Sequence, residues 1–123
     1  MRVLVADDEA AMTRALEALL KREHYSVDVV NNGQDALDQF AASAPGTFDA
    51  IIMDVMMPVM DGYQATRAIR QLDRPDAGSI PILAMTANAF AEDVQLARSA
   101  GMNEHISKPL DMTRLRDVMR KWL

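Results

Sequence analysis

The amino-acid sequence predicts one α/β domain built on a doubly wound parallel sheet of five strands. Short apolar runs alternate five times with amphipathic segments, which is typical of parallel strands joined by right-handed helical crossovers. Three of the runs are almost entirely apolar, as expected for strands covered by helices on both faces. The 123 residues fit a single domain, residues 1–123, with a sizeable core.

Five runs are predicted to be strands, at residues 3–6, 27–30, 50–53, 80–85 and 104–107. The last is the weakest by composition. It is favoured because it lies between Gly101, a turn residue, and the dipeptide Lys108-Pro109.

Amphipathic helices are predicted between these strands. Their apolar residues recur three or four positions apart and form one stripe per helix: Met12, Ala15, Leu16, Leu19 and Leu20; Ala36, Leu37, Phe40 and Ala41; Ala65, Ile69 and Leu72; Phe90, Val94 and Ala97; Leu115, Val118, Met119 and Trp122. Gly101 is expected to end the fourth helix as a C-cap. Asp111 or Thr113 is expected near the start of the fifth, where a helix favours a side-chain acceptor.

Composition argues against several classes of function. The chain has no cysteine, and its two histidines, His24 and His105, are far apart, so neither a thiolate site nor a histidine-based zinc site is expected. A net charge of −5 disfavours unaided nucleic-acid binding, which needs a basic face. We find no signal-peptide pattern and no run near the ~18 apolar residues of a membrane span, and we therefore expect a cytoplasmic protein.

Polar residues stand at the ends of four predicted strands: Asp7 and Asp8, then Asp54, then Thr86, then Lys108. Parallel strands end at one edge of a sheet, and ligands bind at that edge. Taken singly, each residue has a common structural explanation, such as helix capping for the Asp pair. Their joint placement favours a functional site, and it explains why an apolar strand ends on a carboxylate at Asp54.

Three carboxylates at one edge repel one another and raise at least one pKa unless a cation relieves them. Oxygen ligands without histidine or cysteine favour a hard ion, Mg²⁺ first and Mn²⁺ or Ca²⁺ next. Mg²⁺ keeps waters and accepts phosphate oxygens, which is compatible with phosphoryl chemistry at Asp54.

Four motifs together carry a resemblance to a known family: the acidic pair in "VLVADDE", "MDVMMPVMDG" around Asp54, "LAMTA" around Thr86 and "ISKP" around Lys108. Over essentially its whole length the chain resembles a receiver domain of two-component response regulators. The segments "MPVMDGYQATRAIR", "AMTANAFAED" and "GMNEHISKPL" are most similar to receivers of hybrid sensor histidine kinases. The resemblance implies a flavodoxin-like fold with strand order 2-1-3-4-5.

The resemblance also implies roles at the strand ends. Asp54 would be the phosphoacceptor. Asp8 and Asp54, with the backbone carbonyl of Met56, would hold Mg²⁺, and Asp7 would act mostly through bound water. A carboxylate is a competent nucleophile for such chemistry, which needs in-line positioning and charge neutralisation.

Further roles concern the switch. Lys108 would pair with a phosphate oxygen, and Thr86 would bond another and shift on activation. The bond between Lys108 and Pro109 would be cis. The family usually carries Tyr or Phe three residues before this lysine, and this chain has His105 there instead. His105 is a candidate for the same switching role, and a partly exposed strand residue with no special role is the alternative.

The implied partners are a sensor histidine kinase or a phosphotransfer protein that donates the phosphoryl group. A downstream output domain or protein would bind the face of the fourth helix, fifth strand and fifth helix. The activity would be self-directed phosphotransfer with slow autodephosphorylation rather than conventional enzyme turnover.

Two other functions stay open: a Mg²⁺-dependent hydrolase with an aspartyl nucleophile, and a binding module independent of phosphorylation. The hydrolase usually needs a general acid and a capping insertion, and no segment here is long enough for a cap. The joint presence of Asp8, Asp54, Thr86 and Lys108 argues against the second. Neither a GxxxxGK[ST] nor a GxGxxG motif is present.

Overall fold

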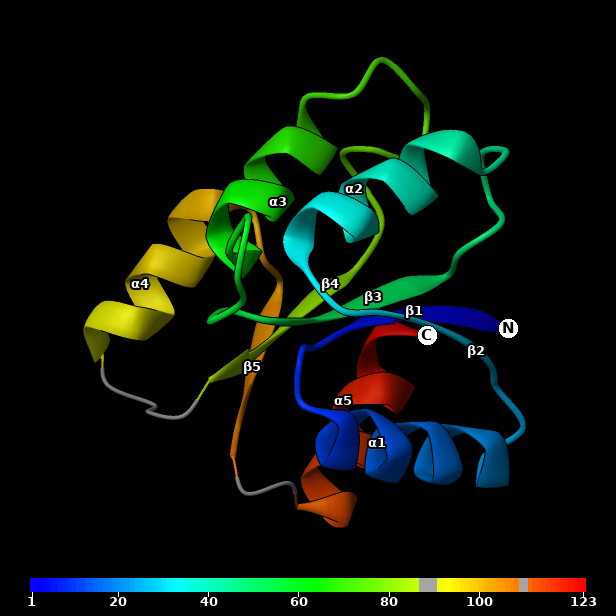
Figure 1. Ribbon diagram of the computed structural model, residues 1–123. Coiled ribbons are helices and arrows are strands. Elements are labelled where there is room, and N and C mark those ends of the chain that lie inside the picture. The colour runs from blue at the N-terminus through cyan, green and yellow to red at the C-terminus, as the bar shows by residue number, and fades with distance from the viewer. Residues whose placement is uncertain (87–90, 109–110) are drawn as a thin grey trace.

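The protein folds into a five-stranded parallel sheet with helices on both faces (Figure 1). The computed structural model describes residues 1–86, 91–108 and 111–123. The strand order is β2-β1-β3-β4-β5, and all neighbouring strands pair in parallel. The predicted fold class and strand order are therefore confirmed.

Strands and helices alternate along the chain as β1 (Arg2–Ala6), α1 (Ala10–Arg22), β2 (Ser26–Val30), α2 (Gly33–Ala42), β3 (Ala50–Asp54), α3 (Gly62–Arg70), β4 (Ile82–Thr86), α4 (Ala91–Ala100), β5 (Glu104–Ser107) and α5 (Met112–Trp122).

The sheet separates two hydrophobic cores. Figure 1 shows α1 and α5 on one face and α2, α3 and α4 on the other. Alternate residues of the central strands contribute to opposite cores. In β1, Val3 and Val5 pack with α1 and α5. Leu4 and Ala6 pack with α2 and α3. Because both faces are covered, every residue of β3 and β4 is buried, including the terminal Asp54 and Thr86.

Side-chain caps fix where three helices begin. The Asn32 side chain accepts a hydrogen bond from a backbone N–H at the start of α2. Asp61 and Gln64 form a capping box at the start of α3. Asp111 caps α5 by accepting from the N–H of Thr113, so of the two predicted cap residues Asp111 is the one used.

The predicted fourth strand is displaced in the structure. It begins at Ile82 rather than Ile80, because the N–H of Ile80 donates to the Asp76 carbonyl in a turn and Pro81 has no N–H to donate. Leu72, predicted within the third helical stripe, follows the end of α3 but still packs against the core.

Gly101 ends α4 as predicted, with a φ of 107° that a side chain would disfavour. Phe90, assigned to this helix from its spacing, lies outside the described residues, as does the Lys108–Pro109 bond.

Arg70 ties the end of α3 to the loops around it. Its guanidinium donates to the carbonyls of Gly101 and Ala77 and to Oδ1 of Asn103, at 2.8–3.0 Å. That Asn103 oxygen also accepts from the N–H of Ile82. Arg70 therefore holds the end of α4 and the start of β4 to α3.

Glu104 performs a similar task between β5 and α5. Its carboxylate accepts the indole N–H of Trp122 at 2.9 Å, the Lys121 ammonium at 3.3 Å and the Arg114 guanidinium at 3.2 Å. Both ends of α5 are thereby attached to the edge strand.

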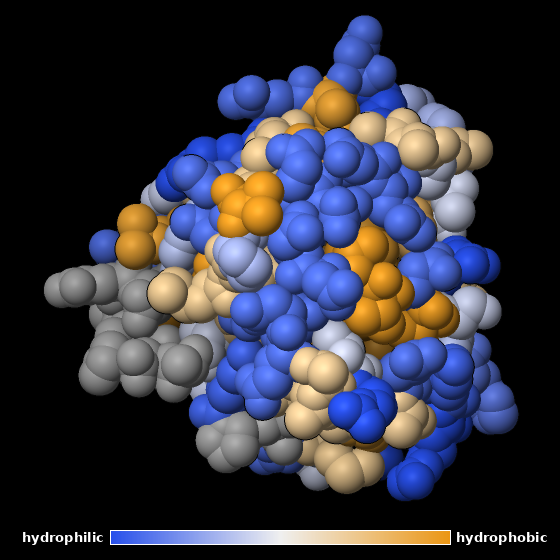
Figure 2. Space-filling view, viewed as in Figure 1, coloured by the Kyte–Doolittle hydropathy of each residue, from blue (hydrophilic) through white to orange (hydrophobic). Residues whose placement is uncertain are grey.

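The face in Figure 2 is mostly hydrophilic, with small hydrophobic patches separated by polar side chains. One patch lies over the edge strand β2, where Val29 is exposed. Among the described residues, no helix has the length and apolar character needed to cross a membrane.

Candidate functional site

The carboxyl ends of four adjacent strands bring together the polar residues picked out from the sequence. Asp7 and Asp8 follow β1, Asp54 and Thr86 are the last residues of β3 and β4, and Lys108 follows β5. Since β1, β3, β4 and β5 are consecutive in the sheet, these residues share one edge.

The three carboxylates converge. Asp7, Asp8 and Asp54 can each offer one oxygen such that the three oxygens lie within 4.8 Å of one another. Asp7 is fully buried and Asp54 is 4% exposed, whereas Asp8 is open to solvent. The Lys108 ammonium lies 3.0 Å from Oδ2 of Asp54 and 3.6 Å from Oδ2 of Asp7.

This arrangement raises the pKa values of two groups, the Asp7 carboxyl and the Lys108 ammonium. Burial raises the pKa of Asp7; the N–H of Glu9 lowers it, Asp54 raises it and Lys108 lowers it, with a net upward shift. Burial also lowers the pKa of the Lys108 ammonium, but the hydrogen bond and charge of Asp54, with the charges of Asp7 and Glu9, outweigh this and raise it. Lys108 is therefore a firmly protonated cation against the carboxylates.

Two buried oxygens at this edge accept or donate no hydrogen bond within the described residues: Oδ2 of Asp7 and Oγ1 of Thr86. A buried polar atom without a partner lowers stability unless a ligand completes it. The carboxylates supply hard oxygen donors suited to Mg²⁺, and Asp7, whose Oδ2 accepts no hydrogen bond from the described residues and lies 3.6 Å from the Lys108 ammonium, belongs to that cluster. The residues present thus fit a hard divalent cation.

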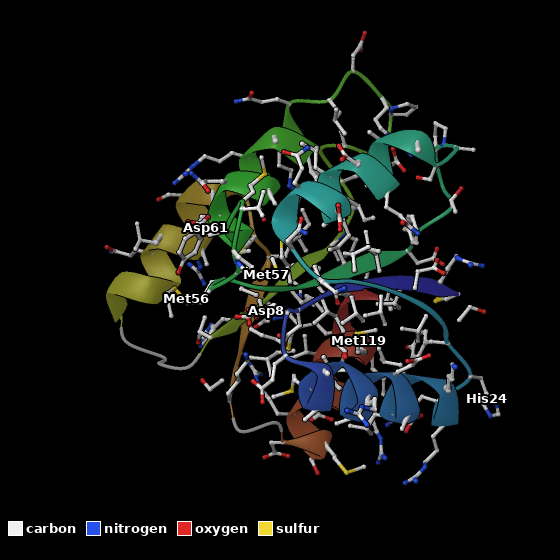
Figure 3. All side chains as sticks on the ribbon, in the orientation of Figure 1. Asp8, His24, Met56, Met57, Asp61 and Met119 are labelled. Carbon is white, nitrogen blue, oxygen red and sulfur yellow. The ribbon has the colours of Figure 1, made fainter. Side chains whose placement is uncertain are left out.

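The segment between β3 and α3, residues 55–61, is here called the site loop. Its first turn contacts the nucleophile candidate, since the N–H of Met56 donates to Oδ1 of Asp54 at 3.1 Å. Figure 3 shows Met56 and Met57 at the same end of the sheet as Asp8, with His24 at the other end.

The site loop is strained at Val59. The N–H of Met60 donates to the Pro58 carbonyl at 2.8 Å, which closes a three-residue γ-turn with Val59 at a φ of 69°. A β-branched residue rarely adopts positive φ, and such a conformation stores about 1–3 kcal/mol. Val59 and Met56 are also 82% and 73% exposed, so the loop presents apolar side chains beside the site.

His105 lies outside the carboxylate cluster. Its register partner on β4 is Ala84, two residues before Thr86, so His105 and Thr86 lie on the same side of the sheet. His105 is half-buried and lines, with Val94 and Arg98, a cavity of about 60 Å³ between α4 and β5. Its proposed switching role stays a prediction.

Apart from the Met56 carbonyl, sequence reasoning missed the backbone groups of the site. The N–H of Glu9 donates to Oδ1 of Asp7 at 2.9 Å, and Gly62 packs against the backbone of Asp54. Glu9 offered no signal, because every residue type except proline carries a backbone N–H. The glycine in "MDG" could have been interpreted as a close approach as well as a turn.

Known proteins that are similar in sequence to this chain belong to the family that its motifs resemble. The profile of the family described as "Response regulator receiver domain" matches residues 3–120. Hybrid signal transduction histidine kinase L of Dictyostelium discoideum is 36% identical over 122 residues, and sensor histidine kinase GacS of Pseudomonas protegens is 38% identical over 122 residues. Each alignment covers 98% of this chain, but this chain spans only 7% and 13% of those relatives.

Solved structures of receiver proteins have the same fold as this chain. The receiver domain of sensor histidine kinase PA1611 from Pseudomonas aeruginosa, with magnesium coordinated in its active site cleft, has a TM-score of 0.88 and 34% identity, covering 98% of this chain and 95% of that one. Chemotaxis protein CheY4 of Vibrio cholerae has a TM-score of 0.90 and 28% identity, covering 99% and 98%. With its fold, its strand-end residues and its sequence profile in agreement, the chain belongs to the response regulator receiver domain family of two-component signalling.

Proposed function

We propose that the chain is a phosphoacceptor in a two-component phosphorelay, and that Asp54 receives the phosphoryl group from a phosphohistidine. The observation that carries this is the position of the Asp54 carboxylate. It is buried at the end of β3, bonded to the Lys108 ammonium, and within 4.8 Å of oxygens of Asp7 and Asp8.

In the transfer, a carboxylate oxygen of Asp54 forms a bond to phosphorus while the bond from phosphorus to the donor imidazole nitrogen breaks. The electron pair of that bond stays on the imidazole, and the product on this chain is an acyl phosphate. The Met56 N–H and the Lys108 ammonium hold the two oxygens of Asp54, so the nucleophile is oriented before the donor arrives.

Lys108 and Thr86 have distinct roles. Lys108, at 3.0 Å from Asp54, is placed to neutralise charge that develops on the phosphoryl oxygens. The Thr86 hydroxyl, buried and without a partner among the described residues, is available to donate to one of those oxygens.

Asp8 and Asp54, with the carbonyl of Met56, would hold Mg²⁺, and Asp7 would act mostly through water; Mn²⁺ is a possible substitute. When bound, the ion supplies charge neutralisation and alignment of the phosphoryl group. The raised pKa of Asp7 supports a cation-binding role, because a nearby cation would relieve the burial of that charge.

The proposed donor is a sensor histidine kinase or a phosphotransfer protein. The proposed receiver of the signal is an output domain or protein that binds the face formed by α4, β5 and α5, with Thr86 and His105 as the residues that move. This face adjoins the site because Lys108 directly follows β5.

Intact mass after incubation with Mg²⁺ and acetyl phosphate tests the function. The wild type should gain about 80 Da, the mass of one phosphoryl group. Asp54→Asn should gain none, while Asp73→Asn, which alters an exposed carboxylate in the α3–β4 loop, should behave as the wild type.

An adduct on Asp54→Asn at the wild-type rate would contradict the assignment of the phosphoacceptor. A wild type that gains no mass at any Mg²⁺ concentration would favour the alternative of a binding module independent of phosphorylation.

A further inference from the structure

We propose that Gly33, the first residue of α2, is a positioning residue for the metal site: it holds the site loop in the position from which the Met56 carbonyl would bind the metal. The proposal rests on the proposed function, since only there is that carbonyl a metal ligand. Helix α2 contributes none of the predicted site residues, so motif analysis gave no reason to consider Gly33.

The contact is a backbone hydrogen bond between two elements. The N–H of Gly33 donates to the Met60 carbonyl at 3.0 Å. The first N–H groups of a helix have no partner within the helix and carry its positive dipole end. The Asn32 side chain satisfies one of them, at Asp35, and the site loop satisfies the one at Gly33. Figure 1 shows the start of α2 beside the loop that leaves β3.

Only glycine fits this contact. A Cβ built on Gly33 would lie 2.2 Å from the Met60 carbonyl oxygen and 3.0 Å from the Asp61 carbonyl oxygen. Backbone conformation does not explain the residue, because Gly33 has no positive φ, and alanine is the better helix former. The close approach of the loop does explain it.

The site loop cannot absorb a displacement at its α3 end. The N–H of Gly62 donates to the Val55 carbonyl, and a Cβ at Gly62 would lie 2.4 Å from the Asp54 carbonyl oxygen. The N–H of Val55 is itself bonded to the Met85 carbonyl on β4. A displacement of the Met60 carbonyl must therefore be accommodated by residues 56–59, which include Met56 and the strained residue Val59.

Gly33→Ala tests the proposal. Its methyl group would displace the Met60 carbonyl by about 1 Å, and misplacement of that size is enough to impair a catalytic constellation. We expect Mg²⁺ affinity to fall roughly tenfold, as when support of a metal ligand is removed. Labelling by acetyl phosphate should fall at limiting Mg²⁺ and recover largely at saturating Mg²⁺.

Gly78→Ala is the matched control, because Gly78 is exposed, lacks a positive φ and has no atom within 4 Å of an added Cβ. Wild-type Mg²⁺ affinity in Gly33→Ala would overturn the proposal, whether or not its stability has fallen. If the wild type binds Mg²⁺ but gains no phosphoryl group, the proposed function fails, and the affinity comparison still decides the role of Gly33.

A measurement on the wild type covers the case in which Gly33→Ala does not fold. During a Mg²⁺ titration followed by NMR, the amide proton of Gly33 should shift with the same binding curve as that of Met56. The amide of Asp35, in the same turn but bonded to Asn32, should shift clearly less. A silent Gly33 amide, or equal shifts at Gly33 and Asp35, would overturn the proposal.

Discussion

Thr86 ends β4 with a hydroxyl that is buried and, among the described residues, has no hydrogen-bond partner. Thr66, on α3, is also buried, but its hydroxyl donates to the Gly62 carbonyl at 2.7 Å. The Thr66 hydroxyl thus has a partner within the fold, whereas that of Thr86 is unpaired among the described residues and is the one we propose to donate to a phosphoryl oxygen.

Thr86→Val should stabilise the unphosphorylated protein by about 1 kcal/mol, since valine has a similar shape and removes an unsatisfied group. The same change should slow labelling by acetyl phosphate, because the donor to the phosphoryl oxygen is lost. Urea unfolding and intact mass measure the two effects. Thr66→Val should instead destabilise the fold, and equal destabilisation by both changes would refute the distinction.

At the scale of elements, side chains that donate to several backbone carbonyls hold helices in place. Arg70→Lys should destabilise the protein by about 2 kcal/mol, because one ammonium cannot reach Gly101, Ala77 and Asn103 in the fork geometry of a guanidinium. Urea unfolding of this variant is compared with that of Arg67→Lys, an exposed position of the same helix. Similar stabilities for the two variants would show that the three contacts do not hold α4 and β4.

The attachment of α5 to β5 should depend on pH. Burial raises the pKa of Glu104, but hydrogen bonds from Trp122, Lys121 and Arg114 outweigh it, and the net pKa is lowered. A lowered folded-state pKa contributes stability above the unfolded value of about 4.3, and that stability is lost as the pH falls through the folded value.

Glu104→Gln should therefore lower the free energy of unfolding by about 1 kcal/mol at pH 7, and by progressively less below about pH 4. Lys121 is 65% exposed, so Lys121→Ala should have an effect of at most about 0.5 kcal/mol. Urea titrations across this pH range measure the difference from the wild type. A difference that is constant with pH would exclude the carboxylate as its cause.

The sequence was sufficient for the elements and for the strand-end residues, because apolar runs mark where buried strands stop and parallel topology brings those ends together. It was insufficient for contacts between groups that are distant in the sequence. The spacing of apolar residues does not indicate that the Arg70 guanidinium donates to the Gly101 carbonyl, or that the Gly33 N–H donates to the Met60 carbonyl. The conformation of Val59 could not be predicted either, since valine disfavours the positive φ that it adopts. The start of β4 was misplaced because apolar Ile80 belongs to a turn.

At the scale of the whole molecule, a chain of net charge −5 gathers three carboxylates at one sheet edge. Mg²⁺ should therefore stabilise the fold, by about 2.7 kcal/mol when its concentration is a hundred times the dissociation constant. Asp8→Ala should abolish this gain and leave the metal-free protein as stable as the wild type or more so, because one repelling charge is removed.

Thermal unfolding with MgCl₂, against NaCl of equal ionic strength, measures the effect. Asp73→Ala controls for the loss of one negative charge far from the cluster. An equal Mg²⁺ response in Asp8→Ala and the wild type would exclude Asp8 as a ligand.

Trp122 is the single tryptophan of the chain, and its indole N–H donates to Glu104 on the edge strand. The Lys121 ammonium lies 5.5 Å from the centroid of the indole ring. The molecule thus contains one natural fluorophore, located at the junction of α5 and β5. Indole emission moves to longer wavelength when water replaces a protein environment, so detachment of α5 would be visible as a red shift without any label. Rearrangement of the proposed output face can then be followed in real time, in the same cuvette in which acetyl phosphate is added.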